Sequence, residues 1–365
     1  MMDSWILQPG FPLLRVHMTG RLSNQTVEFE LSQQRMLMSD EHRNDMDIQA
    51  QLWSIPVLVQ HAAGQTQPII MTTASQQLNL VQQVNNGVEY YMFNPNMSGV
   101  YHVFYDNATL QLLQNSFTSL TALNQFTVLA DRLALMLSGY ISADSYLLFL
   151  YDVLQRVNTD LAINKVSYVF WRHIISALTT IDSMFCEYGS ATLYSIQTDL
   201  WMANANNNDG SSSQSFVNAD HSTLQNFRSF SRDLLAPVWE LVNKWSSSTS
   251  DTDDITSLRP YLASALILFN DTQVIAEGYS IFVSNDLTAI DPNLIVPVLE
   301  AALTYTSATE TTLQWIFTHF SNLNSENQLN ALRALGAFCI ISLFFFFFFF
   351  FIFFYIKHKM GNNKT

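Results

Sequence analysis

The stretch Val100–Asp106, VYHVFYD, decides the fold of this chain, because the sequence periodicity changes directly after it. Its β-branched and aromatic residues are typical of a strand, and the preceding stretch 94–99, NPNMSG, has the composition of a turn. Further upstream, residues 26–31, TVEFEL, alternate polar and apolar side chains with the period of a half-buried strand. We therefore predict a small antiparallel β-sandwich over residues 15–106.

After Asp106 the apolar residues recur with a period of about 3.6, which indicates amphipathic helices. Three stripes carry this prediction: Phe126, Leu129, Leu133 and Leu137, ended by Gly139; Leu147, Leu150, Tyr151 and Leu154, with Ser142 as the cap; and Phe170, Ile174, Ala177 and Ile181. Further helices are predicted over 193–202, 223–245, 256–268, 274–282, 294–304 and 311–320. Short helices with polar joins favour an all-α solenoid of paired, HEAT-like helices over residues 107–335. The predicted fold class is α+β, with several domains.

The end of the chain is an unbroken apolar run from Ala334 to Ile356 that contains eight consecutive phenylalanines, Phe344–Phe351. A helix of roughly 20 apolar residues crosses a bilayer, so this run is a transmembrane candidate. Lysines follow it, which favours a cytoplasmic C-terminus and a location at the membrane with the rest of the chain on the extracellular or lumenal side. A second origin for the hydrophobic tail, residues 336–365, is a truncated gene model or read-through exon, because a poly-T stretch encodes phenylalanine.

The amino-acid composition limits the classes of molecule that this chain can bind. The net charge is −14 and charged residues make up 13% of the chain, about half the usual share. No cluster of Lys and Arg offers phosphates a binding surface, so nucleic acid is excluded as a partner. Tripeptides of the form Asn-x-Ser/Thr mark four candidate N-glycosylation sites ahead of the tail: Asn24, Asn96, Asn107 and Asn270.

The sequence contains no catalytic constellation. Its eight histidines never form H-E-x-x-H, and C-x-x-C, G-x-S-x-G and the P-loop are absent. His42 lies in the charged stretch DEHRND and is interpreted as part of a solvated loop, and His173 as a partly buried histidine of an amphipathic helix. We therefore assign no catalytic, cofactor-binding or metal-binding residue, and we expect a non-catalytic module.

Seven landmarks of this sequence resemble, in order, the C-terminal, non-catalytic portion of the aminopeptidase N family of zinc metallopeptidases. The sequence as a whole resembles those of insect membrane-bound aminopeptidases. The landmarks are Trp5–Pro12, Trp53–Pro56, Asn94 with Gly99–Asp106, Leu129–Arg132, Leu258–Pro260, Ile290–Leu294 and Ala334–Gly336.

The resemblance implies that residues 1–14 are a remnant of the preceding catalytic domain, which would carry the zinc. It also implies that this chain walls the peptide chamber of an enzyme that removes N-terminal amino acids, with peptides as partners through that parent enzyme. The family commonly has arginine where this chain has His102. The alternative is a free-standing, membrane-anchored decoy or scaffold that binds peptides or proteins. The sequence indicates no oligomeric state.

Overall fold

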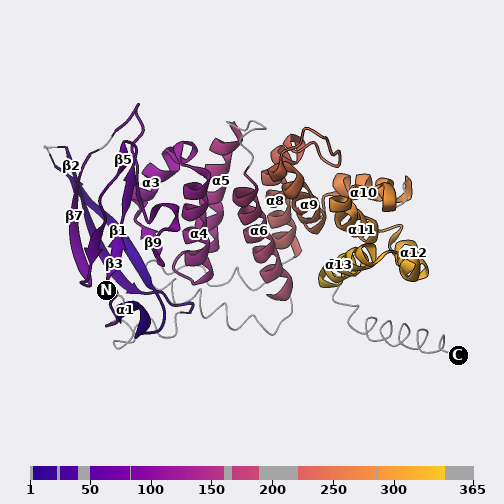
Figure 1. Cartoon of the computed structure of the whole chain (residues 1–365), viewed down its shortest axis with the longest axis horizontal. Coiled ribbons are helices and arrows are strands. Elements are labelled where there is room, and N and C mark those ends of the chain that lie inside the picture. Colours follow the sequence, from indigo (N-terminus) through magenta and orange to yellow (C-terminus); the bar gives the residue numbers. More distant parts are fainter. Residues whose placement is uncertain are drawn as a thin grey trace. The chain divides into compact units, whose positions relative to one another are not determined.

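The computed structural model describes residues 3–22, 25–39, 50–82, 84–159, 167–188, 221–284 and 287–341. Within these residues a sheet region comes first and helices follow (Figure 1). The strands are β1 Pro12–Arg21, β2 Thr26–Arg35, β3 Ile55–Val57, β4 Val59–His61, β5 Gly64–Gln65, β6 Ile69–Met71, β7 Ser75–Val81, β8 Tyr91–Phe93 and β9 His102–Tyr105. The helices are α1 Asp3–Ile6, α3 Asn107–Asn115, α4 Ala122–Leu137, α5 Ala143–Thr159, α6 Tyr168–Tyr188, α8 His221–Leu241, α9 Asp253–Leu268, α10 Thr272–Ser284, α11 Ile295–Thr304, α12 Thr309–His319 and α13 Ser325–Ile341. Short 3-10 turns join several of them: η1 Pro95–Met97, η2 Phe117–Ser119, η4 Leu287–Ala289, η5 Pro292–Leu294 and η6 Phe320–Asn322.

The strands form three small sheets, in the orders β7-β2-β1-β9, β3-β6 and β5-β4-β8. Strands β1 and β2 pair in antiparallel fashion, and so do β2 and β7. Strand β9, however, lies parallel to β1, with Leu13 opposite His102. The prediction of a wholly antiparallel sheet region is therefore wrong at this edge. A parallel neighbour needs a long connection, and here the chain between β1 and β9 includes the other seven strands.

Aromatic side chains fill the core between the larger sheet and the sheet that contains β8. The ring of Phe29, on β2, lies 5.2 Å from that of Tyr91 and 5.6 Å from that of Phe93, in edge-to-face geometry. Tyr105, on β9, packs against Phe93 at 6.2 Å. Its hydroxyl donates to the carbonyl of Phe93 and accepts from the backbone N–H of the same residue. The period-two pattern that predicted β2 is confirmed, because Phe29 and its apolar neighbours on alternate positions are fully buried.

A single buried amide joins three segments of the sheet region. The side chain of Gln33, on β2, accepts a hydrogen bond from the backbone N–H of Trp53 at 2.8 Å and donates to the carbonyls of Trp53 and Thr73, both at 3.0 Å. Gln33 is 6% exposed, so each of these bonds is largely shielded from water. The residues between Trp53 and Thr73 are thereby fixed to β2 without a regular ladder.

The change from strands to helices occurs at Asp106, as the sequence predicts. The Asp106 carboxylate caps α3 by accepting from the backbone N–H of Thr109 at 2.8 Å. Ser142 caps α5 in the predicted way, since its hydroxyl accepts from the N–H of Ser145. Gly139 follows α4 with φ +70°, the left-handed conformation expected at that end. The helix predicted over 193–202 lies outside the described residues.

The predicted apolar stripes are correct for one helix and wrong in part for two. On α6, Phe170, Ile174, Ala177 and Ile181 are all buried. On α4 the predicted Leu129 is fully buried, whereas the predicted Leu137 is 36% exposed. The rest of the buried face consists of Asn124, Thr127, Val128, Asp131, Arg132 and Leu135. On α5, Tyr151 is exposed and Tyr146 and Phe149 are buried. On α4 the reason is that polar side chains find partners inside the fold, which a stripe of apolar residues cannot reveal.

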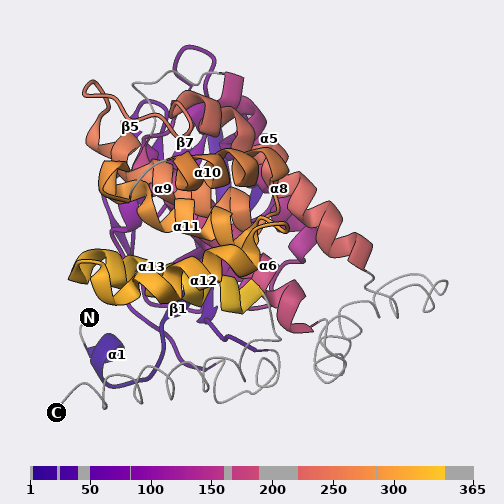
Figure 2. The same ribbon diagram turned by 90° about the vertical axis from the view of Figure 1, so that its right-hand side faces the viewer.

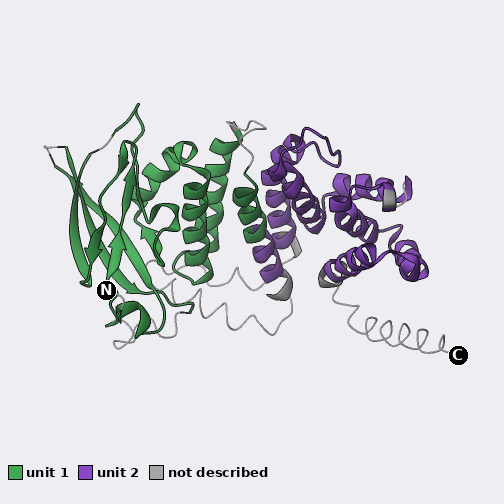
Figure 3. Ribbon diagram, viewed as in Figure 1, with its two compact units in different colours: residues 1–177, 187–217 green, residues 178–186, 218–365 purple. Residues whose placement is uncertain are grey.

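The chain divides into two compact units (Figure 3). Unit 1 comprises residues 1–177 and 187–217, and unit 2 comprises residues 178–186 and 218–365, so the division falls within α6. In unit 2, α11 packs against α9, α10 and α13 (Figure 2). Its buried residues Val298 and Leu299 share one core with Ile316 of α12 and Ala334 of α13.

The membrane location predicted from the sequence is corrected by this structure. Among the described residues, no helix has the length and the apolarity needed to cross a bilayer. The transmembrane candidate, Ala334 to Ile356, begins inside α13, where Ala334 is fully buried and Leu335 is 6% exposed in the core of unit 2. These side chains pack against protein because α13 supplies the last apolar face of that core. The candidate's residues after Ile341 lie outside the described residues.

Replacement of Gln33 by alanine is expected to lower the free energy of unfolding by about 2–3 kcal/mol, because the buried N–H and carbonyl groups of Trp53 and Thr73 lose their partner. Urea denaturation followed by tryptophan fluorescence measures the change. The control is Gln77→Ala on β7, where the side chain is exposed and an effect within about 0.5 kcal/mol is expected. Equal effects of the two substitutions would contradict the role given to Gln33.

Candidate functional site

The turn before β9 is built to present His102. Asn94 adopts a left-handed conformation with φ 55° and is fully buried. Its side-chain amide donates to the carbonyls of Gly99 and Tyr101, at 3.1 and 2.8 Å, and its carbonyl oxygen accepts from the N–H of Gly99 at 2.7 Å. Residue 99 must be glycine, because a Cβ there would lie 2.2 Å from the Tyr101 ring. Asparagine and glycine together therefore fix the entry of the strand.

Helix α4 meets this turn with polar side chains. Asn124 is 1% exposed; its carbonyl oxygen accepts from the backbone N–H of Asn96 at 2.8 Å, and its amide donates to Gln60 at the same distance. Two turns later along the same helix, Asp131 is 2% exposed and its carboxylate lies 2.8 Å from Nδ1 of His102. The landmark that contains His102 and the landmark that contains Asp131 are thus joined by one ion pair. The sequence contains both landmarks, but it does not show that they are in contact.

The Asp131 carboxylate has an unusual proton affinity. Burial raises its pKa to about 6, and the hydrogen bond and the charge of His102 oppose that rise, together with the backbone N–H of Val103. Burial also raises the pKa of the Tyr101 and Tyr105 hydroxyls, and the Asp131 charge adds to the effect. Both tyrosines therefore stay neutral at physiological pH and serve as packing and hydrogen-bonding groups.

Arg132, next to Asp131, extends the polar face toward α5. It donates through Nη2 to the carbonyl oxygen of Ser145 at 3.0 Å and to its hydroxyl at 2.9 Å, and its guanidinium lies 5.0 Å from the centre of the Phe149 ring. Burial lowers the pKa of Arg132 to about 10, and the neighbouring Tyr146 hydroxyl opposes the change. These contacts of the Arg132 guanidinium hold α4 and α5 together. A prediction from the hydrophobic pattern would place this charged group on the surface.

In unit 2 a buried arginine of the landmark Leu258–Pro260 bonds to the backbone just beyond the end of a helix. Arg259, on α9, is 1% exposed and donates through Nε and Nη2 to the carbonyl of Val242, at 2.9 and 2.8 Å. Its Nη2 also lies 2.6 Å from Asp251, in the loop that precedes α9. The guanidinium thereby satisfies a carbonyl beyond the end of α8 and fixes that loop.

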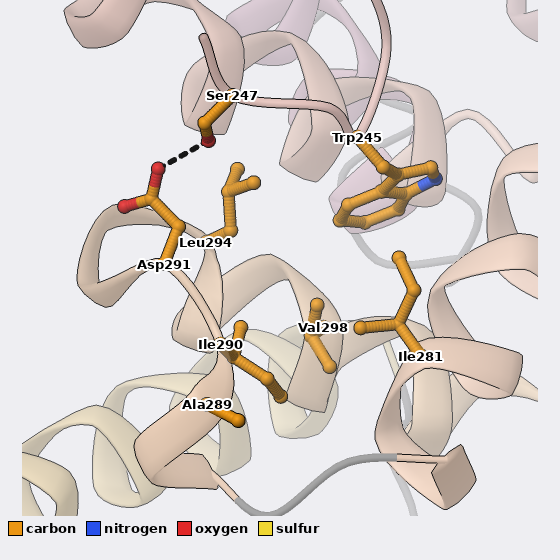
Figure 4. A pocket seen from close by; sticks show the side chains of 8 residues that line it. All are labelled: Trp245, Ser247, Ile281, Ala289, Ile290, Asp291, Leu294 and Val298. Atoms are coloured by element: carbon orange, nitrogen blue, oxygen red, sulfur yellow. Dashed lines mark hydrogen bonds between the residues drawn. The ribbon is translucent and has the colours of Figure 1, made fainter. Parts of the chain in front are cut away.

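Unit 2 also contains a partly open cavity of about 320 Å³ (Figure 4). Most of its lining side chains are apolar, and the Ser247 hydroxyl donates a hydrogen bond to the Asp291 carboxylate at its wall. The carboxylate is occupied on its other side as well, since it caps η5 by accepting from Asn293. The lining residues are Trp245, Ser247, Ile281, Ala289, Ile290, Asp291, Leu294 and Val298.

Neither region holds a catalytic arrangement. Among the described residues, no three His, Cys, Asp or Glu side chains lie close enough together to bind a metal ion. The strongest candidate for acid–base chemistry in unit 2 is Glu300 on α11, whose pKa is raised to about 7 by burial and lowered in part by a hydrogen bond with Ser264. This hydrogen bond joins α11 to Ser264 of α9, so Glu300 is assigned a structural role.

Comparison with known proteins identifies the family. The family described as the ERAP1-like C-terminal domain matches residues 90–213 and 200–343, which together are well over half of the chain. The chain belongs to this family. Tricorn protease-interacting factor F2 of Thermoplasma acidophilum is 25% identical over 146 residues, 40% of this chain and 16% of that protein. Glutamyl aminopeptidase of Sus scrofa is 26% identical over 187 residues, 50% of this chain and 18% of that protein.

The chain thus matches less than a fifth of the length of these relatives. Its predicted likeness to the C-terminal portion of an aminopeptidase is confirmed. The family's matched region starts at residue 90 and includes both partners of the His102–Asp131 pair.

The candidate glycosylation sites remain predictions. Asn96 lies in η1, Asn107 is the first residue of α3 and Asn270 follows α9, and all three are exposed. Thr109, the third residue of the second site, is fully buried. Asn24 lies outside the described residues.

Replacement of Gly278 by alanine is expected to destabilise unit 2 by about 1–3 kcal/mol, because the new Cβ would lie 2.6 Å from Cβ of Ala301 and 2.9 Å from the Trp245 ring. A shift of the indole should also change the tryptophan emission. The matched control is Gly336→Ala on α13, where a Cβ meets nothing within 4 Å and helix propensity predicts a gain of up to about 1 kcal/mol. A neutral Gly278→Ala would show that the contact is easily relieved.

Replacement of Glu300 by glutamine should remove part of the pH dependence of stability. The folded state binds the Glu300 proton more tightly than the unfolded state, so the wild-type free energy of unfolding falls as pH rises from about 4.5 to about 7. Glutamine cannot ionise, and the variant should be more stable than wild type by about 2–3 kcal/mol at pH 8, with little difference at pH 4.5. Denaturation at several pH values measures this, with the exposed Glu310→Gln as control. Parallel pH profiles for wild type and Glu300→Gln would refute the prediction.

Proposed function

We propose that this chain is the non-catalytic C-terminal region of a zinc aminopeptidase, an enzyme that removes N-terminal amino acids from peptides. The observation that carries the proposal is the match of residues 90–343 to the ERAP1-like C-terminal domain family. The relative named glutamyl aminopeptidase supports the reaction class. Peptides would reach this chain only through the parent enzyme.

The proposed role of the helical part is to wall the peptide chamber and restrict access to it. We place the domains at residues 1–14, a remnant of the catalytic domain, 15–106, a β-sandwich, and 107–335, a solenoid of paired, HEAT-like helices. The start of the helices after Asp106 supports this division. The packing of α11 between neighbouring helices within unit 2 supports the paired arrangement.

Zinc does not fit the described residues. No cluster of ligands exists among them, so no catalytic step is assigned to this chain and the metal-activated water would belong to a preceding domain. The part of the chain described by the structure would contribute shape and packing to the enzyme.

Long-read sequencing of transcripts from this locus tests the proposal directly. We expect an in-frame zinc-peptidase region, with H-E-x-x-H, ahead of the codon for Trp5. Transcripts that begin directly ahead of this region with a signal-peptide exon would contradict the proposal and favour a free-standing binding protein.

The purified chain by itself should bind no zinc at one equivalent and should not hydrolyse aminoacyl-nitroanilides, because the described residues offer no metal site. Metal analysis and a chromogenic assay measure this. Turnover that is abolished by a chelator would overturn it. For the chamber role, the polypeptide that includes the zinc-peptidase region is compared with a version that lacks residues 107–341. The proposal expects the dependence of cleavage on peptide length to change on deletion.

A further inference from the structure

The cavity of unit 2 is lined by four separate segments of the chain. Trp245 and Ser247 follow α8, Ile281 lies on α10, Asp291 precedes η5 and Val298 lies on α11. Its volume of about 320 Å³ is at the lower end of the range of about 300–1,000 Å³ that is usual for ligand sites. The space therefore suits a small molecule with a single ring or a short alkyl chain.

One side of the cavity is apolar and aromatic. Figure 4 shows Trp245 and Ile281 on the side opposite Asp291. The indole of Trp245 packs edge to face on Trp239, with the ring centres 5.6 Å apart. Gly278 leaves room for this indole, because a Cβ at that position would lie 2.9 Å from it. The indole is thus held by its neighbours and offers a firm surface to an apolar ligand.

The other side of the cavity carries the carboxylate of Asp291, which is half-buried. Oδ2 accepts from the hydroxyl of Ser247, and Oδ1 accepts from the backbone N–H of Asn293 at 2.9 Å. A carboxylate has acceptor sites for about four hydrogen bonds. Each oxygen of Asp291 can therefore accept one more bond from a donor in the cavity.

The charge of Asp291 is not balanced by a basic side chain in the described part of the chain. The two basic residues that flank the segment with Ser247 in the sequence are engaged with other acids. Lys244 pairs with Glu240 at 2.7 Å, and Arg259 pairs with Asp251 at 2.6 Å. The whole chain has a net charge of −14, so cations from solution are attracted to it.

We propose that this cavity binds a small organic cation, an amine that carries one aromatic ring or a short alkyl chain. The ammonium group donates to Asp291, and the apolar body lies against Trp245 and Ile281. A hydrogen bond between two charged groups is stronger than one between neutral groups, so an amine is preferred to an alcohol of the same shape. A carboxylate of that shape is repelled by Asp291. The site does not depend on the proposed peptidase role.

Two aspartates of unit 2 give a matched pair of variants. Asp291→Asn removes the charge and keeps a side-chain oxygen that caps η5. Asp271 caps α10 in a similar way, since its Oδ1 accepts from the backbone N–H groups of Gln273 and Val274, but it does not line the cavity. Asp271→Asn therefore makes the same change of charge and of cap outside the proposed site.

A third variant fills the cavity. Ala289 lies at its wall and is exposed, so a larger side chain there does not displace the core of unit 2. Ala289→Phe should place a ring in the space that the ligand needs.

The experiment titrates the full chain with three probes that share a phenyl ring and a two-carbon linker: phenethylamine, phenethyl alcohol and hydrocinnamate. The solution is held at about pH 7.5, where an alkylamine keeps its proton. Calorimetry measures binding, and the tryptophan emission should change because Trp245 forms one wall. We expect phenethylamine to bind with a dissociation constant of about 1 mM or below, the alcohol to bind about tenfold more weakly and hydrocinnamate not to bind.

The variants locate the binding. Asp291→Asn should reduce the affinity for phenethylamine about tenfold, to the level of the alcohol, and Ala289→Phe should abolish the binding of both. Asp271→Asn should bind the amine as wild type does.

Three outcomes would overturn the proposal: no binding of phenethylamine to wild type, equal or tighter binding of the alcohol or of hydrocinnamate, or an equal loss of affinity in Asp271→Asn and Asp291→Asn. The comparison of the three probes needs only the wild-type chain, so it decides even if a variant does not fold.

Discussion

Unit 1 depends on the polar buried face of α4. Asn124 bonds to the turn before β9, Asp131 pairs with β9 itself and Arg132 bonds to the start of α5. Each of these groups would be costly to bury alone, and each is compensated by a partner on a different element. The hydrophobic effect has no direction, whereas a hydrogen bond or an ion pair joins two particular groups. Three directed contacts along one helix fix its register against the strands.

In unit 2, arginine side chains fix the positions of helices, as the polar side chains of α4 do in unit 1. Arg259 occupies the carbonyl of Val242 beyond the end of α8 and the carboxylate of Asp251. Arg228, on α8, forms a two-pronged pair with Asp182 of α6, at 2.7 and 2.9 Å. The planar guanidinium suits both tasks, since its donors lie in a fixed plane and match carboxylate and carbonyl oxygens. The helices of this unit therefore have defined ends and neighbours in addition to a shared apolar core.

Two titratable groups of this member of the ERAP1-like C-terminal domain family affect its packing through their protonation. Asp131 and Glu300 are of this type, because burial raises the pKa of both toward neutrality. Both residues can be read from the sequence, but only the fold shows that they are buried.

The sequence by itself determined the order of strands and helices, the change at Asp106 and the family, because these depend on local periodicity and on short motifs. It predicted the apolar part of the buried face of α6, but not the buried Asp182 on the same helix. It could not predict the polar part of the buried face of α4, nor the buried face of α13, where Leu329 and Leu332 are exposed while Asn327 and Asn330 are buried. It also placed Ala334 at the start of a membrane span, and the fold places that residue in the core of unit 2. Tertiary structure decided these points for two reasons. A polar side chain is buried only where a partner from another element meets it. Whether an apolar side chain lies in lipid, in water or in the core depends on the elements packed around it.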